Sequence, residues 1–136
     1  MSDSAARAHL RRALEAHLTQ LGYSRARLRQ GTPAAEIARM SPIRGRLAYG
    51  ETVLHTDLHR RSCHERLLFF SQRRTRQRSS ILFFIGVAES DYEAVETLLQ
   101  ELGIRNSVRG GHVHIVAIPM PAHRRRTTVP ATRRAG

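Results

Sequence analysis

The chain has 136 residues, 40% of them hydrophobic, which fits one compact domain. Its 23 basic side chains, all arginine, face 11 acidic ones, so the formal net charge is +12. No apolar run approaches the ~20 residues of a membrane span, the N-terminus lacks the apolar core of a signal peptide, and the single cysteine, Cys63, excludes an internal disulfide. We therefore expect a cytoplasmic protein with no membrane partner.

Hydrophobic periodicity predicts a helix and then three strands in the first half of the chain. Apolar residues at helical spacing mark a helix over residues 4–21, with Asp3 or Ser4 as its N-cap and with Arg7, Arg11 and Arg12 facing outward. The predicted strands cover residues 23–30, 34–40 and 46–53, with turns at residues 31–33 and 41–45. Residues 55–57 are expected to form a loop.

The second half predicts two helices, two strands and a tail. Helices are expected over residues 58–74 and 90–102, the second opened by a Ser90–Glu93 capping box, and strands over residues 81–87 and 112–118. The run 81–87 is apolar throughout, so we expect this strand to be buried on both faces. Residues 121–136 are arginine-rich with no acidic residue and predict a disordered basic tail after a domain of residues 1–120.

This order of elements, α-β-β-β-α-β-α-β, predicts an α/β domain with a mixed sheet and helices on both of its faces. The four phenylalanines all lie in apolar runs and are expected in the core. Few aromatic side chains would then be left on the surface for stacking on bases, which favours duplex or structured nucleic acid over single strands.

The arginine excess predicts the kind of partner. Because arginine pairs bidentately with phosphate, a chain this basic is expected to bind nucleic acid, with DNA favoured over RNA. An acidic protein or a ribonucleoprotein is the alternative partner. The arginines that we assign to nucleic acid are Arg60, Arg61, Arg73, Arg74, Arg76, Arg78, Arg124, Arg125 and Arg126.

Two carboxylates in the predicted strands are candidates for chemistry. Glu36 and Glu51 fall on adjacent strands, where they could converge on one hard cation that activates water. Ion pairs with the many arginines are the alternative, and spacing alone favours them. His112 and His114 alternate on the last strand at a spacing that could ligate a metal, but no third ligand is evident.

The stretch AAEIARMSPIRGRLAYGETVLHTDL, the helix HERLLFFSQRR and the runs ILFFIGVA and GHVHIVAIP follow one another in the chain. In this order they resemble the PD-(D/E)xK nuclease superfamily, with its restriction-endonuclease-like core, over residues 5–119. The resemblance implies that Glu36 takes the first acidic position, that Glu51 is the glutamate of E-x-K, and that both bind Mg²⁺.

The chain departs from this pattern at the third catalytic position. Val53 stands where the family has lysine, and the sequence contains no lysine; His55 is the candidate substitute. We therefore expect a degenerate member that binds nucleic acid without cutting it and needs no cofactor, either as a subunit of a larger complex or as a homodimer. The alternative is an active endonuclease that uses Mg²⁺ with Glu36, Glu51 and His55.

Overall fold

The computed structural model describes residues 2–26, 34–43, 46–74 and 81–121. These ranges form three α-helices and one five-stranded mixed sheet, which places the chain in the mixed α/β class. The helices are α1 (Asp3–Gln20), α2 (Arg61–Ser71) and α3 (Tyr92–Glu101). The strands are β1 (Ser24–Arg25), β2 (Ile37–Met40), β3 (Leu47–Val53), β4 (Leu82–Ala88) and β5 (Val113–Ile118). The predicted order of these elements is confirmed.

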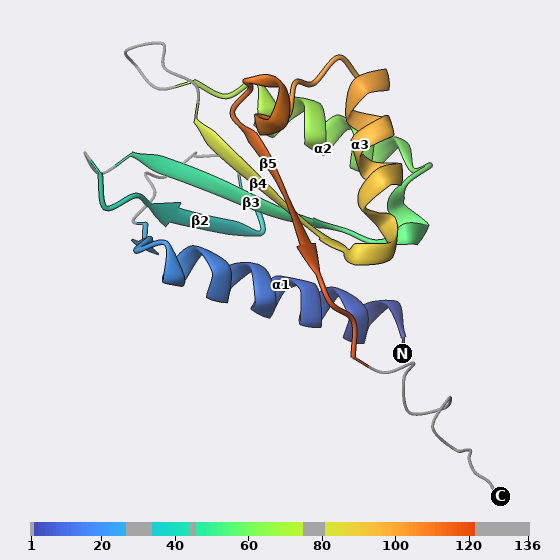
Figure 1. Ribbon diagram of the computed structural model, residues 1–136, viewed down its shortest axis with the longest axis horizontal. Coiled ribbons are helices and arrows are strands. Elements are labelled where there is room, and N and C mark those ends of the chain that lie inside the picture. Colours follow the sequence, from blue (N-terminus) through green and yellow to red (C-terminus); the bar gives the residue numbers. More distant parts are fainter. Residues whose placement is uncertain (1, 27–33, 44–45, 75–80, 122–136) are drawn as a thin grey trace, which may run out of the picture.

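The sheet changes from antiparallel to parallel at β3. The strands lie in chain order; the pairs β1–β2 and β2–β3 are antiparallel, and the pairs β3–β4 and β4–β5 are parallel. Helix α1 covers one face of the sheet, and α2 and α3 cover the other (Figure 1). Strand β3 extends beyond its pairing with β2, which starts opposite Gly50, so its last residues are paired in the sheet with β4 only.

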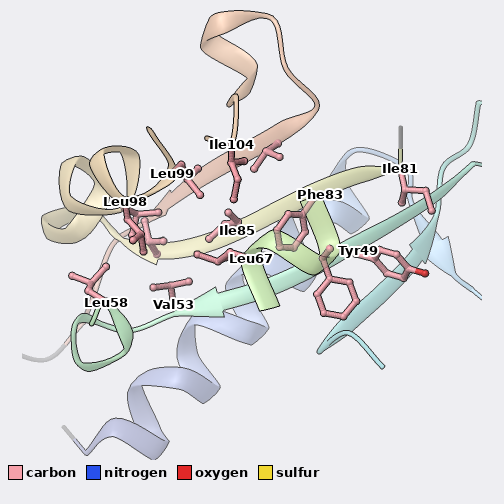
Figure 2. Packing of buried hydrophobic residues seen from close by; sticks show 14 residues of the cluster. Tyr49, Val53, Leu58, Leu67, Ile81, Phe83, Ile85, Leu98, Leu99 and Ile104 are labelled. Atoms are coloured by element: carbon pink, nitrogen blue, oxygen red, sulfur yellow. The ribbon is translucent and has the colours of Figure 1, made fainter. Parts of the chain in front are cut away.

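Each face of the sheet has its own apolar core. On the α1 side, Leu10, Leu14 and Leu18 are fully buried. On the other side, Tyr49, Val53, Leu67 and Phe83 belong to the larger cluster under α2 and α3 (Figure 2). Six of the seven residues of β4 are buried, as the continuous apolar run predicts.

Two strand glycines let α1 lie close to the sheet. A Cβ atom at Gly50 or at Gly86 would stand 3.3 Å from Cδ2 of Leu14. This separation is tighter than ordinary van der Waals contact, so Leu14 occupies the space that side chains at these two positions would fill.

Several predicted helix boundaries are wrong. The N-cap of α1 is Ser2, whose Oγ accepts from the backbone N–H of Ala5 at 3.1 Å, instead of Asp3 or Ser4. Helix α2 starts at Arg61 because residues 55–57 form a 3₁₀ turn, η1 (His55–Asp57). Ser90 lies in another 3₁₀ turn, η2 (Glu89–Asp91), so the expected capping box does not form.

Two predicted side-chain placements are also wrong. Arg7 was expected to face outward but reaches β3 and η1, because acceptors there draw it inward. Phe69 was expected in the core but is 43% exposed, because the buried side of α2 is formed by Leu67, Phe70 and Ser71, and Phe69 lies outside it.

Some predictions fall outside the described residues: the second half of strand 23–30, the turn at residues 31–33, residues 44–45 of the turn at 41–45, and the tail after Pro121. Of the helices that the structure does describe, none has both the length and the apolar character needed to cross a membrane.

Candidate functional site

A cavity of about 350 Å³ opens where β3 runs beyond β2. Its wall combines the end of β3, the approach to β2, η1 and the first turns of α2, with Arg7 reaching in from α1. The lining residues are Arg7, Glu36, Glu51, Thr52, Val53, Asp57, Arg60, Ser62, Cys63, Arg66 and Leu67. The two carboxylates singled out from the sequence thus share one cavity.

Glu51 is the most enclosed acidic group of this cavity. Its side chain is only 5% exposed, on the face of β3 that α2 covers, and such a carboxylate needs hydrogen-bond donors. Arg66 of α2 supplies two: Nε donates to Oε1 at 2.7 Å and a terminal nitrogen donates to Oε2 at 2.8 Å. The same Oε2 accepts from the backbone N–H of Glu36 at 2.7 Å. The hydrogen bond to Glu51 raises the pKa of Arg66, so this guanidinium stays charged.

Glu36 is held by the strand next to its own. Its Oε1 accepts from the backbone N–H of Thr52 at 2.7 Å, and the Thr52 hydroxyl lies 2.9 Å from each carboxylate oxygen. Arg7 in turn donates to the Thr52 hydroxyl at 3.1 Å. The two glutamates therefore belong to one network that runs from α1 through β3 to α2.

Asp57 anchors the other end of the cavity. Its Oδ2 accepts from the buried backbone N–H of Leu54 at 2.9 Å and from Arg7 at 2.7 Å. Arg60 lies 3.6 Å from Oδ1. The Asp57 side chain is only 9% exposed. Its contacts hold the chain in place where it passes from β3 into α2.

The donor set does not fit a hard cation. Both oxygens of Glu51 already accept hydrogen bonds from the cationic guanidinium of Arg66. Within the described ranges, no three His, Cys, Asp or Glu side chains are grouped so that they could hold a metal ion. The two carboxylates line one cavity, but Arg66 pairs with Glu51, whereas Glu36 accepts from Thr52.

Neither Val53 nor His55 supplies a charged group to the cavity in place of the missing lysine. Val53 is 1% exposed and packs in the apolar cluster with Leu58 and Leu67 (Figure 2). The expectation that His55 lies beside Glu51 is wrong, because β3 ends at Val53 and η1 turns the chain away. The His55 ring is 79% exposed, with Nδ1 at 3.0 Å from Asp91, and does not line the cavity.

Cys63 is the other group in the cavity with nucleophilic potential. Burial, together with the nearby charge of Asp57, raises the pKa of its thiol to about 11. The thiol is therefore protonated at neutral pH, whereas the thiolate is the nucleophile.

Of the nine arginines assigned to nucleic acid, four lie in the described residues, and they form two pairs. Arg60 and Arg61 lie at the start of α2, and Arg61 is 91% exposed. Arg73 and Arg74 follow the end of α2. The others, Arg76, Arg78, Arg124, Arg125 and Arg126, lie outside the described residues.

Positive charge is unevenly distributed along the sequence. Thirteen of the 23 arginines and all 11 acidic residues fall in the described ranges, which therefore carry a formal charge of only +2. The remaining ten arginines stand in residues 27–33, 44–45, 75–80 and 122–136, where the sequence has no acidic residue. The excess charge therefore belongs to these connecting and terminal segments.

His112 and His114 do not form a ligand pair. His112 contacts the backbone carbonyl of Ser71 at 2.5 Å, whereas His114 stacks on Phe84 with ring centroids 4.9 Å apart. Burial, together with the neighbouring His112 and His17, lowers the pKa of His114 and favours its neutral form.

Four residues of this network were not predicted from the sequence: Arg7, Thr52, Asp57 and Arg66. A signal for Arg66 was present, because Glu51 shares its strand face with Leu47, Tyr49 and Val53. A carboxylate on an apolar face requires a cationic partner, and the next predicted helix contains arginines.

Comparisons with known proteins found no matching family model, no matching curated protein and no matching solved structure.

Proposed function

We propose that this protein is a nucleic-acid-binding module on a restriction-endonuclease-like fold, and that an arginine takes the place of the metal in its carboxylate cavity. The bidentate contact of Arg66 with Glu51 is the observation that carries the proposal. This contact satisfies both oxygens of the carboxylate that the resemblance assigns to Mg²⁺. The buried Val53 adds no proton donor and no positive charge to stabilise a phosphoryl transition state.

The arginine distribution supports nucleic acid as the partner. Segments of residues 27–33, 75–80 and 122–136 bring positive charge without carboxylates to compete for it. Phosphate contacts by arginine are sequence-independent and release counterions, so they provide affinity without catalysis. DNA is the proposed ligand and RNA is the alternative. Measuring the affinity for each in the same binding assay distinguishes the two.

Binding should weaken steeply as salt is added. In fluorescence anisotropy with labelled DNA, we expect log K to fall linearly with log salt, with a slope of about −0.9 for each phosphate contacted. Replacing the arginines at positions 73, 74, 76 and 78 by glutamine should weaken binding to unrelated sequences equally. The control removes the same charge from Arg11, Arg12, Arg25 and Arg46, which are exposed elsewhere. An affinity that does not depend on salt would contradict phosphate binding.

The purified protein should not cleave DNA or RNA with Mg²⁺ or Mn²⁺. Val53 lines the cavity, so Val53→Lys introduces the amine that the resembled nucleases have, and Val53→Met serves as the size control. Cleavage gained by Val53→Lys alone would identify the missing lysine as the defect. Metal-dependent cleavage by the wild type, abolished by Glu51→Ala, would overturn the proposal and identify an active endonuclease.

A further inference from the structure

One exposed face of α2 carries an aromatic ring among cationic side chains. Ser62, Arg66 and Phe69 are spaced by four and three residues, so they lie on the same side of the helix. Ser62 and Arg66 line the carboxylate cavity, whereas Phe69 stands further along. These three residues therefore form a line along α2 that runs from the cavity toward the C-terminal end of the helix.

Phe69 is held in place although it is exposed. Its ring makes a T-shaped contact with the buried Phe70, with centroids 5.1 Å apart. The side chain nevertheless leaves 43% of its surface open to solvent. A rigid apolar ring with a free surface is the element that stacking on a base requires.

A cation lies over this ring. The Arg73 guanidinium makes a cation–π contact with Phe69, 5.1 Å from the ring centroid, and the stacking surface is the part of the ring that stays exposed. Every acidic residue of the sequence is among the described ones, and Arg73 forms an ion pair with none of them. Its charge is therefore not neutralised by a carboxylate, unlike that of Arg66.

We propose that Phe69 is a stacking platform for an unpaired base, with Arg73 holding an adjoining phosphate of the same strand. This inference rests on the proposed nucleic-acid binding and narrows its ligand to single-stranded or locally unpaired nucleic acid. It reverses the expectation of a duplex ligand, because that expectation placed all four phenylalanines in the core. An aromatic ring next to an arginine is the combination that binds single strands with little sequence preference.

The test compares a short oligothymidylate with a blunt duplex of the same length. Phe69→Leu should weaken binding of the oligothymidylate about tenfold and leave the affinity for the duplex within about twofold, because only unpaired bases stack on the ring. Leu21→Ala is the matched control, because Leu21 is 48% exposed at the end of α1, on the opposite face of the sheet. Circular dichroism and thermal unfolding check that each variant is folded.

A second variant gives a direct signal of stacking. The chain contains no tryptophan, so Phe69→Trp introduces a single indole at the platform. We expect this variant to bind the oligothymidylate as tightly as the wild type, and its fluorescence to be quenched by the oligothymidylate but not by the duplex.

The outcomes separate this proposal from the one on which it rests. Wild-type protein that binds neither oligomer would overturn nucleic-acid binding itself. Binding that is equally sensitive to Phe69→Leu and Leu21→Ala, or an indole that is not quenched, would overturn only the stacking platform. Unchanged affinities together with an altered sedimentation coefficient for Phe69→Leu would assign Phe69 to a protein contact and also overturn the stacking platform.

Discussion

Replacing Arg66 by alanine is expected to lower the free energy of unfolding by about 2–3 kcal/mol. The change leaves the Glu51 carboxylate, whose side chain is 5% exposed, with the Glu36 backbone N–H as its remaining donor. A buried charge that loses its counterion bears a large desolvation penalty. Because Arg66 itself is 47% exposed, water can partly replace it, so the loss stays below that of a fully buried pair. Urea denaturation measures the difference.

The control removes the charge that Arg66 neutralises. In the double variant Glu51→Gln with Arg66→Ala, the buried group is neutral, so we expect it to be more stable than Arg66→Ala alone. Arg66→Lys should fall between the wild type and Arg66→Ala, since an ammonium keeps the charge but cannot donate in the same two-pronged geometry. A double variant less stable than Arg66→Ala would show that the pairing with Glu51 is not what makes Arg66 important.

Asp57→Ala is expected to lower the free energy of unfolding by about 3 kcal/mol. The substitution removes the acceptor of the buried Leu54 backbone N–H and the partner of Arg7 at the same time. A buried donor without an acceptor costs about 1–3 kcal/mol, and the lost ion pair adds to it.

Asp57→Asn separates the two contributions. The amide oxygen can still accept from Leu54, but it has no charge for Arg7, so a loss of about 1 kcal/mol is expected in the same denaturation assay. Equal losses for alanine and asparagine would show that the charge, and not the backbone acceptor, is what η1 requires.

The sequence predicts the order of the elements because each has a clear hydrophobic period or run. The buried strand β4 follows from the uninterrupted apolar run over residues 81–87, and α1 follows from Leu10, Leu14 and Leu18. Strand alternation also placed Glu51 on the inner face of β3. These features depend on neighbours within one element, which the sequence displays directly.

The cavity network could not be predicted in the same way. Arg7 and Asp57 are 50 residues apart, and no local pattern shows that one attracts the other. Hydrophobicity likewise assigned both Phe69 and Phe70 to the core, although Phe70 is buried and Phe69 is 43% exposed. Which of the two is exposed depends on how α2 sits on the sheet, and that is a tertiary property.

Leu14 packs closely against Gly50 and Gly86, and this contact fixes the position of α1 along its own axis. Arg7 lies seven residues before Leu14, so about 10 Å of rigid helix connects this contact to the cavity. If α1 slid by a single turn, Arg7 would move about 5 Å away from Thr52 and Asp57. By making room for Leu14, the two glycines therefore hold Arg7 at the right height to reach Thr52 and Asp57. They do so although they contact a helix on the opposite side of the sheet from α2.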